Sequence, residues 1–419
     1  MNRMLYVYKS MLNKLQNEWR SSIIFILFIL MITGLFASRA LLSASMITFV
    51  AFSFFHNTIN DQLRKFIHTP LLWSMSLLVV LPLLSGFWSE DKEQWVNIIR
   101  IKFPLLLLPL AFAAPFSFSK KQWEGLGLFF IGLVMIATAW CMFHYTVDIR
   151  TVNEIYLQAK TMTTPLDNDH VRFSWLVAVA ILIAGGVFIE EKKRRLLSAV
   201  LAVSIAWLIV FLHLLAARTG LFSFYIIVIG LATGFVFSKK KWTSSLTLLI
   251  ALVALPVTAY FVLPSFHNRV HYIRYEYDYF KKADYLPGST DAVRIISIKS
   301  GWQVMNQRPL GAGFGDIRKA TREQYAKNYP QMKESDKILP SSEWMIYGAG
   351  TGWPGFIAFT IIMLLPFFVQ THKKITWWLL NSMAAFSFLF DIGLEVQFGV
   401  FIYAFIILSC WKWLNAEKM

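Results

Sequence analysis

The sequence of 419 residues is 57% hydrophobic and 16% aromatic, and only 15% of its residues are charged. Globular soluble domains carry about 25% charged residues, so this composition excludes an ordinary soluble enzyme or binding module. The formal net charge is +16, and it requires no nucleic-acid partner because many of the basic residues sit in short connections that orient a membrane protein. The sequence predicts an all-α polytopic membrane protein.

The apolar runs are long enough, or nearly so, to cross a hydrocarbon core of about 30 Å at about 1.5 Å per residue. The polar segment before the first run is too long for a cleavable signal peptide, so we expect that run to remain in the protein. We predict about twelve transmembrane helices, at 22–37, 40–56, 71–87, 101–116, 124–143, 172–189, 196–213, 219–237, 243–263, 343–369, 375–390 and 395–411.

Clusters of Lys and Arg predict the orientation. If twelve helices alternate, the basic connections share one side, which the positive-inside rule assigns to the cytoplasm. They lie at 64–68, 119–122, 190–195, 238–242 and 372–374. The predicted regions are a cytoplasmic segment 1–21, nine spans within 22–263, a periplasmic loop domain 264–342 containing helices, three spans within 343–411 and a cytoplasmic tail 412–419.

Several catalytic and metal-binding patterns are absent from the sequence. It has no CxxC, HExxH, P-loop or nucleophile-elbow motif, which argues against a metalloprotease, an ATP-driven pump and an α/β hydrolase. Cys141 and Cys410 fall in spans near opposite faces of the membrane, so we expect neither a disulfide nor a metal site. We expect no metal and no other cofactor.

An arginine stands inside the apolar segment "LLAARTGLFS", residues 214–223. A guanidinium stays charged and is costly in hydrocarbon, so Arg218 is expected to hold an anionic partner. Its planar fork of donors suits phosphate oxygens, and it could stabilise charge that builds up on a departing diphosphate.

The long loop begins with Arg, Lys and His interleaved with tyrosines, at 266–285. Two interpretations remain open: a surface for an anionic, sugar-bearing ligand, or an amphipathic helix at the membrane interface. A helical pattern follows at 291–305, with Arg294 on its polar side. The glycines at 311, 313 and 315 could expose backbone amides to a phosphate, but a tight reversal between two loop helices is the favoured interpretation.

Near the C-terminus, Asp391 and Glu395 are four residues apart, on one face if the segment is helical. Carboxylates beside a span are candidate functional groups, and we expect these two to pair with Arg218 or Arg294. That pairing would place them beside the site.

These motifs, in this order, resemble the O-antigen ligase and polymerase superfamily. The segments that carry the resemblance are "DHVRFSW" (169–175), "AARTGLFSFYI" (216–226), "RPLGAGFGD" (308–316), "SSEWMIYGAGTGWPG" (341–355) and "LEVQFGVFIYAF" (394–405). The resemblance implies a GT-C-like membrane glycosyltransferase. It would transfer a glycan from a polyprenyl-diphosphate carrier to a lipid A core or another glycan acceptor, at the periplasmic face of the bacterial inner membrane. It also implies that Arg218, with Arg172 and Arg294, binds the lipid diphosphate.

The sequence departs from the family at the expected general base. Counted back from Gly352 and Gly355, the family's His and Asn fall on Ser341 and Ser342. Glu343, adjacent to that position, and His170 are the alternative candidates for the base. Predicted supporting residues are Ser341, Ser342, Asp391, Glu395 and Gln397.

Ligase and repeat-unit polymerase differ in the acceptor, and both remain open. A transporter for anionic solutes is a third hypothesis. The sequence shows neither an internal repeat nor a matching pair of Gly/Pro-broken spans, and both are common in transporters.

Overall fold

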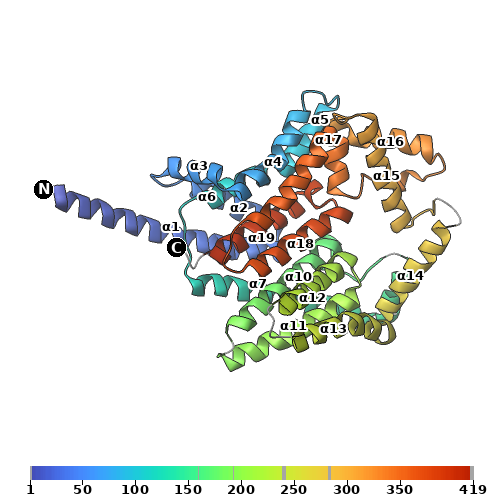
Figure 1. Ribbon diagram of the computed structural model, residues 1–419, viewed down its shortest axis with the longest axis horizontal. Helices are drawn as coiled ribbons and strands as arrows, with labels where there is room; N and C mark the ends of the chain where they lie inside the picture. The colour runs from blue at the N-terminus through green and yellow to red at the C-terminus, as the bar shows by residue number, and fades with distance from the viewer. Residues whose placement is uncertain (1, 159, 192, 238–241, 282–284, 416–419) are drawn as a thin grey trace.

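The computed structural model describes residues 2–158, 160–191, 193–237, 242–281 and 285–415, with side chains from Trp19 onward except that of Phe280. This part of the chain contains helices and connections but no strand, as predicted. Figure 1 shows the helices in one bundle, with α14, α15 and α16 at the end away from the C-terminus. The first thirteen helices are α1 (Asn2–Ala37), α2 (Arg39–Ser53), α3 (Ile59–His68), α4 (Pro70–Ser85), α5 (Lys92–Lys102), α6 (Pro104–Ala113), α7 (Lys120–Val147), α8 (Ile149–Ile155), α9 (Pro165–Asn168), α10 (His170–Glu190), α11 (Arg195–Leu215), α12 (Arg218–Phe237) and α13 (Trp242–Val262).

The remaining helices include those of the predicted loop domain. They are α14 (Pro264–Phe280), α15 (Asp291–Gln307), α16 (Ile317–Asn328), α17 (Glu343–Leu364), α18 (Lys374–Phe390) and α19 (Gln397–Asn415). Short 3-10 turns lie at η1 (Tyr156–Gln158), η2 (Phe314–Asp316), η3 (Glu334–Asp336), η4 (Leu365–Phe368) and η5 (Gly393–Glu395). The prediction that the segment 264–342 contains helices is therefore confirmed.

Within the described residues, nine helical segments are long and apolar enough to cross a membrane, or ten if α3 and α4, bent by 84°, form one span. The sequence predicted about twelve. One of the predicted spans, 71–87, corresponds to the 16-residue α4, which is counted only if it forms one span with α3. Two others, 40–56 and 375–390, correspond to α2 and α18. These helices have 15 and 17 residues, fewer than the 18 or so that a span usually needs. The polytopic all-α class is confirmed.

Polar contacts tie together the helix ends at one end of the bundle. Lys412, in the last helix, donates to the carbonyls of Ala114 and Phe116 at 3.4 and 3.3 Å. Glu190 forms ion pairs with Lys120 and Lys373. The basic connections near 119–122, 190–195 and 372–374 therefore meet at one end, which is the arrangement that alternating helices require.

A break in α17 determines how the predicted loop domain joins the bundle. Thr351 and Gly352 leave the helical conformation, and the segment 308–315 packs into the break. Backbone hydrogen bonds join the two segments: Ala312 N to Ala349 O at 2.8 Å, Gly313 N to Gly350 O at 2.9 Å and Trp353 N to Pro309 O at 3.0 Å. Two of the glycine-rich motifs found in the sequence thus form one joint, which we call the glycine joint.

The backbone amides of residues 311–315 are used within the protein, and that of Gly311 donates to Arg308 O at 2.7 Å. Besides the bonds of the glycine joint, Phe314 N donates to Ser85 Oγ at 3.1 Å and Gly315 N to Ser89 Oγ at 3.3 Å. The alternative that these glycines form a phosphate-binding nest is therefore wrong. The favoured interpretation, a tight reversal between two loop helices, is confirmed, since the segment connects α15 to α16.

The glycine joint leaves no room for a side chain at Gly352. A Cβ there would lie 1.8 Å from Pro309 O, and the backbone has φ of 70° and ψ of −156°, a region almost restricted to glycine. We predict that Gly352→Ala lowers the free energy of unfolding by about 3 kcal/mol or more. The melting temperature of the purified protein in detergent measures this loss.

Gly185→Ala is the matched control, because a Cβ at that helical position meets nothing within 4 Å. It should leave the melting temperature unchanged or slightly raised, since alanine favours a helix over glycine by roughly 0.5–1 kcal/mol. Equal melting temperatures for the two variants would contradict the described joint.

Candidate functional site

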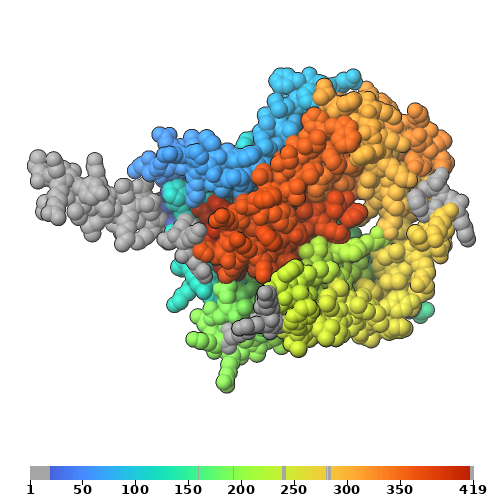
Figure 2. Space-filling view, viewed as in Figure 1, coloured from blue at the N-terminus to red at the C-terminus, as the bar shows by residue number. Residues whose placement is uncertain are grey.

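Four arginines gather at the end of the bundle opposite the Lys412 contacts, which we call the arginine end. Arg172 lies in the first turn of α10 and Arg218 begins α12, while Arg269 and Arg294 lie on α14 and α15. Figure 2 shows an opening on this side of the molecule, between the gold segment of α15, the red end of α18 and the green helices below. The predicted diphosphate-binding residues thus belong to neighbouring elements.

Arg218 forms an ion pair with Asp291, the first residue of α15. Both side chains are about three-quarters buried. The pair uses one terminal nitrogen, Nη1, while Nε and Nη2 are buried without a hydrogen-bond partner in the described structure. The predicted anionic partner exists within the protein, but it satisfies only part of the guanidinium.

Arg269 is a site residue that the sequence analysis did not single out. Its side chain is 8% exposed, and its Nε and Nη1 have no hydrogen-bond partner among the described residues. Burial lowers the pKa of Arg269, and the nearby charge of Arg218 lowers it further. Two cations held together in a buried place favour an anion between or beside them.

The position of Asp291 is fixed by Glu276, a buried residue of α14. The Glu276 carboxylate accepts hydrogen bonds from the backbone N–H groups of Thr290 and Asp291 and from the Tyr272 hydroxyl at 2.9 Å. Burial raises the pKa of Tyr272 to about 12, helped by its hydrogen bond to Glu276. A negative charge at the start of α15 also suits the helix dipole.

Arg172 pairs with two carboxylates at the arginine end. They are Asp169, which also caps α10 through the backbone N–H of Arg172, and Asp391 at 3.5 Å. Arg172 Nε is buried without a partner in the described chain, and a Cβ added to Gly399 would lie 2.8 Å from it. Burial raises the pKa of Asp391, whereas the charges of Arg172 and, more weakly, Arg294 lower it. Arg294 therefore lies close enough to this group for its charge to act on Asp391.

A second buried polar group lies beside the first. Lys102 is fully buried and lies 2.6 Å from Glu395, donates to Leu394 O at 3.1 Å and faces the ring of Tyr347 at 5.0 Å. Glu343, also fully buried, accepts from Leu394 N at 2.6 Å through Oε1, and its Oε2 has no partner in the described structure. The charges of Arg172 and Asp391 act on Glu343, so the two groups adjoin.

As predicted, Asp391 and Glu395 each form an ion pair with a basic side chain, but the predicted partners are wrong. Asp391 pairs with Arg172 and Glu395 with Lys102, rather than with Arg218 or Arg294. The two carboxylates also do not share a helix, because α18 ends before Asp391 and Glu395 belongs to the 3-10 turn η5. The chain reverses between α18 and α19, which sends the carboxylates to different cations.

The remaining predicted site residues are two serines, a histidine and a glutamine, and only the histidine lies beside the arginines. Ser341 is buried and its backbone N–H donates to Ser297 Oγ at 3.0 Å, while Ser342 Oγ donates to Phe388 O at 3.4 Å. These two serines fasten the start of α17 to α15 and α18. His170 is partly buried at the start of α10, two residues before Arg172, and Gln397 is exposed at the start of α19. The structure therefore brings His170 to the arginines and leaves Gln397 at the surface.

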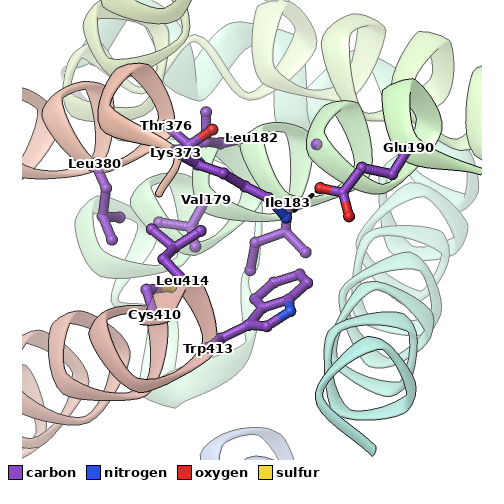
Figure 3. Close-up of a pocket in the computed structure, with 11 residues that line it drawn as sticks. Val179, Leu182, Ile183, Glu190, Lys373, Thr376, Leu380, Cys410, Trp413 and Leu414 are labelled. Carbon is purple, nitrogen blue, oxygen red and sulfur yellow. Dashed lines mark ion pairs between the residues drawn. The ribbon is translucent and has the colours of Figure 1, made fainter. Parts of the chain in front are cut away.

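An apolar pocket at the other end of the bundle differs in chemistry from this site. Figure 3 shows it between α10, α18 and α19, lined mostly by aliphatic side chains and Trp413. Its charged residues, Glu190 and Lys373, form an ion pair with each other. A second pocket between the same three helices lies at the arginine end and includes Arg172, Asp391 and Tyr403. The polar groups that suit a charged ligand thus gather at the arginine end.

The fold and the site define a class: a multi-pass helical membrane protein with a buried group of arginines at one end of its bundle. Residues 203–360 match the family model described as O-antigen ligase. The match confirms the resemblance to the O-antigen ligase and polymerase superfamily and covers Arg218, Arg269, Arg294 and Glu343. No curated protein matches the chain. The family is associated with ligase-like or polymerase-like glycosyltransferase activity on lipid-linked glycans.

The ion pair of Lys102 and Glu395 is testable because both side chains are buried. We predict that Lys102→Ala lowers the free energy of unfolding by about 3–5 kcal/mol, since it leaves a buried carboxylate without its cation. The double variant Lys102→Met, Glu395→Leu should recover most of the lost free energy of unfolding, because it leaves no unpaired buried charge. Thermal unfolding of the single and double variants measures the coupling.

The exposed pair of Lys319 and Glu90 is the control, with side chains 65% and 77% exposed. Lys319→Ala should hardly change the melting temperature, because water screens that pair. If Lys102→Ala were equally harmless, the buried ion pair would not be a structural element of the site.

Proposed function

We propose that the protein transfers a glycan from a polyprenyl-diphosphate carrier to a lipid A core or a similar acceptor, as an O-antigen ligase does. The alternative within the same superfamily is a repeat-unit polymerase, in which the acceptor is another lipid-linked glycan. One observation carries the proposal: three arginines at the arginine end hold buried nitrogens that have no hydrogen-bond partner among the described residues. The atoms are Arg172 Nε, Arg218 Nε and Nη2, and Arg269 Nε and Nη1.

These nitrogens suit a diphosphate better than another carboxylate. A diphosphate presents several oxygens in different directions, and guanidinium groups on different helices can each donate to it. The protein's own carboxylates, Asp169, Asp291 and Asp391, already occupy the other faces of Arg172 and Arg218. We propose that Arg294, on the same helix as Asp291, adds a fourth positive charge.

In the proposed reaction, the acceptor hydroxyl oxygen forms a bond to the anomeric carbon of the donor sugar. The bond between that carbon and the phosphate oxygen breaks, and the lipid diphosphate leaves with the bonding electrons. The arginines stabilise the negative charge that builds up on the leaving oxygen. We propose that they do so without a metal ion or other cofactor.

The hydroxyl proton needs an acceptor, for which we propose Glu343, with His170 as the second candidate. Glu343 Oε2 supports this role because it is buried without a partner in the described part of the chain, while Oε1 accepts from Leu394 N. His170 is supported by its place beside Arg172 at the start of α10. Ser341, where the family carries His, is engaged with Ser297.

We propose that the protein lies in the bacterial inner membrane with the arginine end toward the periplasm and both termini in the cytoplasm. The gathering of the basic connections at the other end of the bundle supports this orientation. It gives the site access to a glycan that is displayed on the periplasmic side.

The first test is Arg218→Lys. We predict a loss of transfer of roughly 10²-fold to 10³-fold in kcat, because an ammonium cannot reproduce the two-nitrogen contact with phosphate. Transfer from a purified lipid-linked glycan in detergent measures the effect. Arg322→Lys is the control, because Arg322 is half exposed and pairs with Glu334 at 2.8 Å. Near-normal transfer by Arg218→Lys would contradict the proposed role of Arg218.

The second test concerns the base. We predict that Glu343→Gln lowers kcat by roughly 10²-fold to 10⁴-fold, the usual contribution of a general base, while leaving donor binding unchanged. His170→Ala should have a smaller effect. Glutamine can still accept from Leu394 N, so the fold should survive, and the melting temperature checks this. Full activity of Glu343→Gln would refute the assignment, and a loss of activity that follows a loss of stability would indicate a structural role.

A further inference from the structure

One face of α15 leads away from the diphosphate site. Asp291, Arg294, Ile298 and Trp302 are spaced three, four and four residues apart, which places them along one side of the helix. Asp291 is bound to Arg218 at the start of this side. Trp302 lies eleven residues farther, a distance of about 16 Å along the helix axis.

Trp302 belongs to an exposed aromatic cluster at the far end of this face. Its ring centroid lies 5.5 Å from that of Trp353 and 6.4 Å from that of Phe356, and both contacts are edge-to-face. Trp302 and Trp353 are 43% and 37% exposed. Large rings that stay exposed while they pack against each other form a rigid surface for a ligand.

Polar side chains accompany the aromatic cluster. A hollow on α15 is lined by Ile298, Lys299, Trp302, Gln303 and Met345. Gln303 also accepts from Asn328 Nδ2 at 2.9 Å, which links α15 to α16. One amide and one ammonium group beside a ring combine hydrogen bonding with an apolar face, as a sugar ring requires.

We propose that Trp302, Trp353, Lys299 and Gln303 form an oligosaccharide subsite, which binds the glycan chain of the lipid-linked donor while its diphosphate lies at the arginines. The inference rests on the proposed function, because the diphosphate anchors one end of the chain. The continuous face of α15 indicates the path, from Arg294 past Ile298 to Trp302. The subsite would bind sugars that are several residues away from the reacting bond.

The distance along α15 gives a specific test, in which the length of the donor glycan is varied. Trp302→Ala should raise the KM for a donor with a long glycan by roughly fivefold to tenfold, without a change in kcat. A donor that carries a single sugar should be unaffected, because it cannot reach a ring about 16 Å away. Trp302→Phe should restore the KM, and the KM for the acceptor should stay constant.

Trp140→Ala is the matched control, since Trp140 on α7 is also 43% exposed. It should leave the KM unchanged for donors of every length. Binding is measured separately by saturation-transfer NMR, with soluble glycan released from the carrier as the probe. Wild type and Trp302→Phe should show saturation transfer from the protein to the glycan protons, and Trp302→Ala should lose this signal.

The outcomes separate the subsite from the proposed function. Unchanged KM values and glycan binding in Trp302→Ala would overturn the subsite while leaving the transferase intact. If that variant instead lost only stability in a bilayer, the aromatic cluster would be a membrane anchor and the subsite would again be overturned. Specific glycan binding by a wild-type protein that catalyses no transfer would overturn the proposed function and support the subsite. A rise in KM for the acceptor alone would overturn the assignment to the donor.

Discussion

The arrangement at the arginine end depends on the cost of burying several guanidinium groups together. Arg172, Arg218 and Arg269 retain buried nitrogens that no described residue contacts by a hydrogen bond, although carboxylates pair with two of these side chains. Like charges in a place with little water repel one another, and each unpaired donor adds a desolvation cost. An anionic ligand that binds several donors at once would offset both costs.

The same charges connect the predicted loop domain to the membrane helices. Arg218 at the start of α12 holds Asp291 at the start of α15, and Glu276 of α14 fixes the backbone there. At its other end, α15 leads into the glycine joint, where backbone hydrogen bonds leave no space for a side chain at Gly352. The two attachments hold α15 at both ends, so that Arg294 and Trp302 keep fixed positions relative to the bundle.

Much of the fold could be predicted from the sequence, because hydrophobic length and the distribution of basic residues are local signals. Arg218 was identifiable as a lone charge in an apolar segment, and the glycine reversal as a cluster of turn residues. The partners of Asp391 and Glu395 were not identifiable, since they depend on contacts such as that of Lys102 with Leu394, 292 residues apart. Lys102 was itself missed because it falls at the start of the predicted span 101–116, where a lysine ordinarily reaches back to the membrane interface.

The role of Arg269 could likewise not be recognised from its local sequence. It stands among other basic and aromatic residues of α14, and nothing in the local pattern distinguishes it from the exposed ones. Its burial results from packing beside Arg218 and Tyr272. A predicted helix over this segment would have placed Arg269, Tyr272 and Glu276 on one face, because they are spaced three and four residues apart. The burial of that face follows only from the tertiary structure.

We propose that the buried guanidinium nitrogens of the arginine end bind a lipid diphosphate. An electron cryomicroscopy structure of the protein in lipid nanodiscs with a polyprenyl diphosphate would measure this directly. We predict diphosphate oxygens about 2.7–2.9 Å from free nitrogens of Arg218 and Arg269, and from Arg172 Nε. Diphosphate density at the opposite end of the bundle beside Lys373, or an arginine end with no bound anion at saturating ligand, would contradict the proposed binding site.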